Sequence, residues 1–219
     1  MRAVHEHGEQ HFGAAAQADE WDARYRERDG AMWSGRPNGR LVAEVAALTP
    51  GRALDVGCGE GADAIWLAQR GWTVTAIDIS EVAIRRAREN LQPAGASVEW
   101  ICGDTLEMPL PARSFELVSI QYPALPKAAG EAAVRRLLDT VGPAGWLLAV
   151  YHDLGDEHRE HLRSRGVDPA DYVGADDLFR LLADDFEVEL HAVEPRIDPP
   201  PGTPHIADVV LRARRDPVG

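Results

Sequence analysis

Short apolar runs alternate along the chain, from Arg52 onward, with segments in which apolar residues recur at helical spacing. Five of these runs are typical of buried strands, at residues 52–57, 72–77, 97–102, 115–121 and 145–151. Helical spacing predicts helices at residues 60–70, 80–92, 128–141, 156–165 and 175–183. Residues 185–193 and 206–213 alternate between apolar and polar side chains, which is typical of a pair of strands. We therefore expect an α/β fold in which a doubly wound, seven-stranded and mostly parallel sheet has an antiparallel last strand.

The sheet pattern begins close to residue 49, which divides the 219 residues into three parts. Residues 1–18 form a polar stretch rich in Gly and Ala, where we expect a flexible tail. Residues 19–48 hold helical patterns and a glycine-containing turn, and we expect a helical cap over the rim of the sheet. Residues 49–214 form the expected core, which is large enough to make the chain a single domain.

Composition narrows the classes of partner. The formal net charge is −13, which argues against binding a nucleic-acid backbone, since that requires clustered Lys and Arg. Cys58 and Cys102 are the two cysteines, and we expect both to be free thiols in a reducing compartment. No apolar run reaches the roughly 18 to 20 residues that cross a bilayer, and the first residues lack the apolar core of a signal peptide. We expect a cytoplasmic protein with no nucleic-acid or membrane partner.

A glycine-rich loop carries the strongest local signal. The sequence Leu-Asp-Val-Gly-Cys-Gly-Glu-Gly at residues 54–61 follows a buried strand and opens a helix. Glycines allow a sharp turn and a close ligand, and the helix N-terminus offers unpaired N–H groups. Gly57, Gly59 and Ala62 also fit the relaxed dinucleotide-binding pattern, so the loop alone leaves the ligand open.

Two carboxylates extend this signal. Asp78 ends the second strand, 21 residues after Gly57, where an acid can accept hydrogen bonds from ribose hydroxyls. Asp104 follows the third strand, where an acid can accept from an exocyclic amine such as that of adenine. Because the carboxyl ends of parallel strands share one rim, we expect both acids to line the same crevice as the glycine loop. The three strand ends predict an adenosine-containing ligand.

With these motifs, the chain resembles the class I methyltransferases from Trp21 to Arg212. The resemblance implies a Rossmann-like methyltransferase fold, S-adenosylmethionine as cofactor and S-adenosylhomocysteine as product. In that family the loop matched by residues 55–61 surrounds the methionine part of the cofactor. The acid matched by Asp78 holds the ribose hydroxyls, and the acid matched by Asp104 meets the adenine amino group.

The same resemblance implies further cofactor contacts. Ile79 and Leu106 would enclose the adenine ring, and Gln121 would lie where cofactor and substrate meet. The turn at residues 33–38 is similar to the lid of the small-molecule branch that includes tellurite-resistance and thiopurine methyltransferases, with Arg36 near the cofactor carboxylate. The expected cofactor-binding residues are Trp33, Arg36, Asp55, Gly57, Cys58, Gly59, Gly61, Asp78, Ile79, Gly103, Asp104, Thr105, Leu106 and Gln121.

Candidate catalytic residues come from the same rim of the sheet. Tyr122 follows the fourth strand and His152 follows the fifth. If residues 185–193 form a parallel strand, the next loop returns to this rim and adds His205. A His or Tyr there can act as a base, although methyl transfer needs one only when the acceptor is protonated.

Several alternatives stay open from sequence. The acceptor is expected to be a small molecule, because residues 121–124 depart from the Asn/Asp-Pro-Pro-aromatic signature of methylases acting on bases or glutamine. The attacked atom (S, O, N, Se, Te or halide) and the choice between monomer and homodimer stay undecided. The rivals are a nicotinamide-dependent oxidoreductase and a non-catalytic S-adenosylmethionine-binding module. We expect no metal site, either at His158 and His161 or in the N-terminal stretch with His5, His7 and His11.

Overall fold

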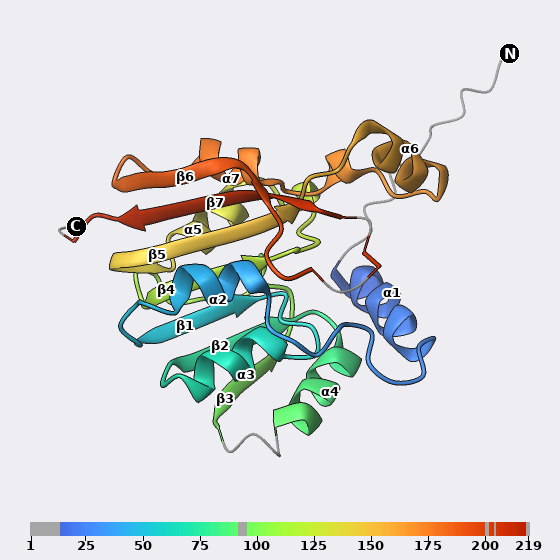
Figure 1. Ribbon diagram of the computed structural model, residues 1–219, viewed down its shortest axis with the longest axis horizontal. Helices are drawn as coiled ribbons and strands as arrows, with labels where there is room; N and C mark the ends of the chain where they lie inside the picture. Colours follow the sequence, from blue (N-terminus) through green and yellow to red (C-terminus); the bar gives the residue numbers. More distant parts are fainter. Residues whose placement is uncertain (1–13, 92–95, 200–201, 204, 218–219) are drawn as a thin grey trace, which may run out of the picture.

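A seven-stranded sheet forms the centre of the molecule (Figure 1). The computed structural model of the chain describes residues 14–91, 96–199, 202–203 and 205–217. The strands are Arg52–Val56 (β1), Thr73–Asp78 (β2), Val98–Cys102 (β3), Phe115–Gln121 (β4), Val141–His152 (β5), Phe186–Pro195 (β6) and Ala207–Arg215 (β7). Their spatial order is β3-β2-β1-β4-β5-β7-β6, and β7 runs antiparallel to both of its neighbours while the other pairs are parallel. The predicted fold class is confirmed.

Helices cover both faces of this sheet. The α-helices are Ala14–Arg26 (α1), Gly39–Val45 (α2), Ala62–Gln69 (α3), Glu81–Leu91 (α4), Glu131–Leu138 (α5), Asp156–Ser164 (α6) and Ala175–Leu181 (α7), with short 3₁₀ helices at Lys127–Ala129 and Pro169–Asp171. Buried side chains of α5 and α7 pack on one face, and those of α2 and α3 pack on the other. Figure 1 shows α1 and α6 beyond the end of the sheet at which the parallel strands finish.

Strand β1 shows why the central strands read as continuous apolar runs. Leu54 and Val56 face the α5 and α7 side, whereas Ala53 faces the α2 and α3 side, and all three are fully buried. Side chains alternate between faces along a strand, so a strand covered on both sides favours apolar residues at successive positions, and the buried Asp55 is the exception in β1. Each fully buried leucine contributes about 1.5 to 3 kcal/mol.

The helix predicted at residues 128–141 is shorter than expected. It begins after Gly130, whose φ of +83° interrupts the helical path, and it ends at Leu138. Val141 already pairs with Phe115 in the sheet, so β5 starts before the predicted residue 145. A bulge between these registers absorbs Gly142 and the residues after it, which the sequence pattern presents as a turn.

The N-terminal boundary also differs from the prediction. Helix α1 begins at Ala14, inside the stretch expected to be a flexible tail at residues 1–18. Residues 1–13, with His5, His7 and His11, lie outside the described residues. Among the residues that the structure describes, no helix has both the length and the apolar character needed to cross a bilayer.

Candidate active site

A cavity of about 830 Å³ lies at the carboxyl ends of the parallel strands. Gly57 after β1, Asp78 at the end of β2 and Asp104 after β3 all line it. Gln121 and His152, the last residues of β4 and β5, line the same cavity. The strand ends therefore meet in one crevice, as expected at the rim of a parallel sheet.

The glycine loop between β1 and α3 has a backbone that other residues rarely adopt. Gly57 and Gly59 have φ values of +68° and +52°, in the left-handed region that favours glycine. The amides of Gly57 and Cys58 both donate to the carbonyl oxygen of Ile77, at 2.8 and 2.9 Å. A Cβ on Gly59 would lie 3.1 Å from the Tyr25 hydroxyl oxygen. The glycines thus allow the loop to hydrogen-bond to β2, and at Gly59 the missing side chain leaves room for the Tyr25 hydroxyl.

Asp78 joins the end of β2 to the glycine loop. Its Oδ2 accepts from the Gly59 amide at 2.8 Å, and its Oδ1 accepts from the Ser80 amide at 2.9 Å. Burial raises the pKa of Asp78, and these two hydrogen bonds oppose the rise. A carboxylate has about four acceptor positions, so Asp78 can accept further hydrogen bonds from a ligand in the cavity.

Two more buried acids lie close to this loop. Burial raises the pKa of Asp55 well above its ordinary value, and the neighbouring Asp63 and Asp78 raise it further. Burial also raises the pKa of Asp63 to about 6, although the two donors of Asn38 oppose the rise. With a pKa of about 6, Asp63 is mostly ionised at neutral pH, and it lines the cavity, so it adds negative charge that suits a cationic ligand.

Most of the expected cofactor residues line the cavity, and three do not. Those lining it are Trp33, Arg36, Gly57, Cys58, Gly59, Asp78, Ile79, Gly103, Asp104, Thr105 and Gln121. Asp55, only 1% exposed, lies behind the loop, and Gly61 packs against the Trp100 ring at the start of α3. Leu106 belongs to the hydrophobic core under α5 and α7, because the turn after β3 points it inward. Ile79 lines the cavity without Leu106 opposite it.

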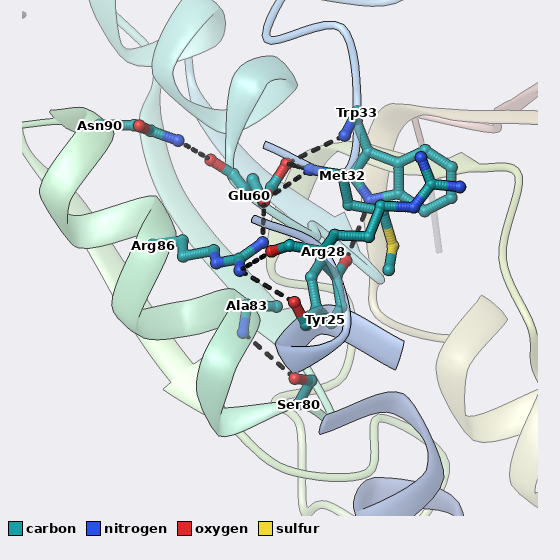
Figure 2. Close-up of polar contacts among 9 residues, drawn as sticks. All are labelled: Tyr25, Arg28, Met32, Trp33, Glu60, Ser80, Ala83, Arg86 and Asn90. Atoms are coloured by element: carbon teal, nitrogen blue, oxygen red, sulfur yellow. Dashed lines mark hydrogen bonds and ion pairs between the residues drawn. The ribbon is translucent and has the colours of Figure 1, made fainter. Parts of the chain in front are cut away.

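A lid segment at residues 32–38 is fixed at both ends by acids, Glu60 of the glycine loop and Asp63 in the first turn of α3. Glu60 accepts hydrogen bonds from the amides of Met32 and Trp33 and pairs with Arg86 at 2.9 Å, as Figure 2 shows. Asp63 accepts from the backbone and side-chain nitrogens of Asn38, both at 2.7 Å. Sequence patterns did not mark Glu60 and Asp63 as lid anchors. The signal that was available is their position, within the glycine loop and in the first turn of the helix after it, where side chains can reach toward a cap.

Between these anchors the lid borders the cavity with its side chains. Trp33 is 54% exposed, and its Nε1 donates to the Tyr25 hydroxyl at 3.0 Å (Figure 2). Arg36 forms an ion pair with Asp198 at 3.0 Å, across the cavity mouth from the loop after β6. The guanidinium expected near a cofactor carboxylate is thus paired with a carboxylate of the chain.

The three candidate catalytic residues come together at the other end of the cavity. Tyr122 stacks on His152 with ring centroids 4.2 Å apart, and His152 stacks on His205 at 4.3 Å. His158 of α6 meets the His205 ring edge-on at 4.6 Å. Tyr122 has a φ of +50°, an unusual value for a tyrosine, at the turn that ends β4. The return of the loop after β6 to this rim, expected from a parallel β6, is confirmed by the strand directions.

Burial shifts the acid–base properties of this cluster. The pKa of His205 is lowered by burial and by the neighbouring His152, His158 and Arg196. The pKa of Tyr122 is raised by burial and by Asp208, so its hydroxyl stays protonated at neutral pH. Stacking presents the faces of the histidine rings to one another and not their nitrogens to a common point. Within the described ranges, no three His, Cys, Asp or Glu side chains are placed to hold a metal ion.

Asp208 is the site residue that sequence gave no means of finding. It lies on β7, is fully buried, and accepts from the Tyr122 hydroxyl at 3.0 Å. The alternation of residues 206–213 marks a strand and assigns no role to a single acid within it. Only the pairing of β7 with β5 brings Asp208 opposite His152.

Comparison with known proteins identifies the domain around the glycine loop. Residues 53–145 match the family model described as a methyltransferase domain. Over these residues the chain is similar to methyltransferase domains. An uncharacterized methyltransferase from Mycobacterium bovis is 36% identical over 97 residues, which cover 44% of this chain and 48% of the relative. The chain spans about half or less of the length of the curated relatives it matches first.

Solved structures share the fold of this chain over nearly its whole length. One, described as the conversion of a disulfide bond into a thioacetal group during echinomycin biosynthesis, has a TM-score of 0.72 and 25% identity, covering 93% of this chain and 94% of that one. Magnesium protoporphyrin IX methyltransferase from Synechocystis PCC 6803, with bound S-adenosylhomocysteine, has a TM-score of 0.65 and 20% identity, covering 93% and 99%. S-adenosylmethionine is the cofactor of this class.

Proposed function

We propose that the chain is an S-adenosylmethionine-dependent methyltransferase that acts on a small molecule. The observation that carries the proposal is one cavity of about 830 Å³ lined by the ends of β1, β2 and β3 and by the stacked Tyr122 and His152. A cavity of this size suits a ligand of drug-like dimensions and its partner substrate. The cofactor supplies a methyl carbon activated on a sulfonium, and the residues of the chain bind and orient the two molecules.

The residues present fit this cofactor. Asp78 offers carboxylate oxygens for ribose hydroxyls, and the side chain of Asp104 offers oxygens for the adenine amino group. Gln121 lines the cavity with a buried Oε1 that has no hydrogen-bond partner among the described residues, so it awaits a donor such as an ammonium group. The Asp63 carboxylate, ionised at neutral pH and lining the cavity, favours the positive charge of the sulfonium.

A small acceptor is supported by the surroundings of the cavity. The net charge of −13 disfavours a nucleic-acid substrate, and residues 33–38 of the lid line the cavity. The magnesium protoporphyrin IX enzyme, which shares the fold, is named for a small-molecule acceptor. Membership of the tellurite-resistance and thiopurine branch stays part of this proposal and depends on the lid turn alone.

The two rivals differ in testable ways. A nicotinamide-dependent oxidoreductase of the dinucleotide-binding type is typically built on a parallel sheet of order 3-2-1-4-5-6, whereas this sheet inserts the antiparallel β7 between β5 and β6. A non-catalytic binding module would bind S-adenosylmethionine and methylate nothing. Cofactor binding and turnover are therefore measured separately.

Replacing Asp78 with alanine is expected to weaken S-adenosylmethionine binding by about 1 to 3 kcal/mol, because charged hydrogen bonds to the ribose are lost. Isothermal titration calorimetry measures this change. Asp153→Ala is the matched control, since Asp153 is exposed and does not line the cavity. Equal affinity in the wild type and Asp78→Ala would contradict the ribose assignment.

The wild type is expected to convert S-adenosylmethionine to S-adenosylhomocysteine in the presence of at least one small acceptor. A screen of thiols, phenols, amines, halides and tellurite, with the demethylated product as readout, tests this. Tight cofactor binding without turnover of any acceptor would favour the non-catalytic module.

A further inference from the structure

Three strands bring a tyrosine, a histidine and an aspartate together at the acceptor end of the cavity. Tyr122 follows β4, His152 ends β5, and Asp208 lies opposite His152 on the antiparallel β7. Oδ2 of Asp208 accepts from the Tyr122 hydroxyl at 3.0 Å, while Oδ1 lies 3.7 Å from Nδ1 of His152. The aspartate therefore faces one polar atom of each of these two stacked side chains.

Two polar atoms in this group are buried and unpaired. Among the described residues, neither Nδ1 of His152 nor Oδ1 of Asp208 has a hydrogen-bond partner. Leaving both unpaired is costly, and the 3.7 Å that separates them is slightly longer than a hydrogen bond. A small closing movement pairs them if Nδ1 carries the proton. Asp208 thereby favours the histidine tautomer with hydrogen on Nδ1.

The second ring nitrogen of His152, Nε2, is available to a molecule bound in the cavity. The ring is held in its plane between Tyr122 and His205, with centroids 4.2 and 4.3 Å away. His152 lines the cavity and its side chain is 30% exposed, whereas Asp208 is not exposed at all. In the Nδ1-protonated tautomer, Nε2 carries a lone pair that can accept a proton.

Among the described residues, Asp208 is the only carboxylate that lies within 4.0 Å of a ring nitrogen of His152. His158 of α6 packs against His205, and Arg196, in the loop after β6, lies over the Tyr122 ring at 5.0 Å. These groups are cations or neutral rings. A positive charge formed on His152 is thus stabilised by the Asp208 carboxylate, in the way that buried acids stabilise histidine bases.

We propose that His152, oriented by Asp208, takes a proton at Nε2 from the methyl acceptor, so that the acceptor is a molecule with an ionisable O–H, S–H or N–H group. The inference rests on the proposed function. The acceptor lone pair forms the new bond to the methyl carbon, the C–S electron pair stays on sulfur, and the acceptor proton passes to His152. The imidazolium then releases its proton to water. Asp208 acts as a positioning residue and does not touch the acceptor.

The tautomer of His152 tests this proposal without turnover. Ring ¹⁵N chemical shifts, assigned with His152→Gln, are measured at a pH at which the ring is neutral. We expect the Nδ1–H tautomer in the wild type and in Asp153→Ala, and its loss in Asp208→Ala. An Nε2–H tautomer in the wild type would overturn the proposal, whether or not Asp208→Ala folds.

A second test measures turnover, with a proton-bearing acceptor identified in the screen. His152→Gln is expected to lower kcat by about 100-fold or more, with KM and cofactor affinity nearly unchanged. The control, His161→Gln, alters an exposed residue of α6 that does not line the cavity and should leave kcat unchanged. Unchanged kcat in His152→Gln, or turnover of halides alone, would overturn the role of His152 while the methyltransferase assignment stands. Failure of the wild type to bind S-adenosylmethionine would instead overturn the proposed function.

Discussion

Single residues at the site are held in states that they would not adopt in water. Asp63 has its pKa raised to about 6 by burial, and the pKa of Cys58 is raised well above the usual range by burial and nearby acids, which keeps the thiol protonated. Gly59 has a backbone conformation that disfavours a side chain. Such strained or desolvated positions are common at functional sites and rare elsewhere.

Gly59→Ala tests the shape of the glycine loop. The new Cβ would meet the Tyr25 hydroxyl at 3.1 Å and Nε1 of Trp33 at 3.3 Å, and the φ of +52° is unfavourable for alanine. We expect a loss of about 1 to 2 kcal/mol in the free energy of unfolding and weaker S-adenosylmethionine binding. Urea denaturation and calorimetry measure the two effects. Wild-type values for both would show that the loop tolerates a side chain.

His205 gives a pH dependence of stability. Its pKa in the folded protein lies below the ordinary value of 6.5, chiefly because the ring is buried, so the unfolded chain binds more protons as the pH falls through this range. The histidine therefore contributes stability above about pH 6.5 that is lost at lower pH. We expect His205→Gln to lose less unfolding free energy than the wild type when urea denaturation is repeated at a lower pH. A steeper loss in the variant would reverse the sign of this argument.

At the scale of elements, the lid is held by the glycine-loop end of α3. Glu60 is 5% exposed and accepts from two lid amides, while Arg86 of α4 lies against it. Helices α1 and α4 also meet through the Tyr25 carbonyl, which accepts from Arg86 at 2.8 Å (Figure 2). One buried carboxylate of the glycine loop thus joins the lid to α4.

Glu60→Gln is expected to lower the free energy of unfolding by about 2 to 4 kcal/mol, because an amide replaces one of two acceptor oxygens and leaves Arg86 without its charge partner. Glu27→Gln, a change at an exposed residue just after α1, should have little effect. Hydrogen exchange should quicken at the amides of Met32 and Trp33 in Glu60→Gln alone. Unchanged protection of these amides would mean that the lid is held by other contacts.

The elements were predictable where one physical rule determined them. The strands followed from apolar runs, and the expected convergence of Gly57, Asp78 and Asp104 followed from the shared rim of parallel strands. The early start of β5 was not predictable, because a bulge near Gly142 depends on pairing with β4. Asp208 and Glu60 were missed for the same reason: their partners lie far away in sequence. The inward orientation of Leu106 likewise depends on packing and not on motif spacing.

At the scale of the whole molecule, the two ends of the cavity are lined by chemically different side chains. Acids gather at the glycine-loop end, while histidines and Tyr122 lie at the end formed by β5, β7 and α6. The antiparallel β7 contributes to the histidine end, because it places Asp208 opposite His152, the last residue of β5. A cationic cofactor at the first end would leave the second end for the acceptor.

The most direct test is a crystal structure of the chain with S-adenosylhomocysteine. We expect one molecule in the cavity, with its ribose hydroxyls on Asp78, its adenine beside Asp104 and its sulfur directed toward Gln121 and His152. Density for the compound elsewhere, or a cavity that binds a nicotinamide dinucleotide and not this compound, would contradict the assignment.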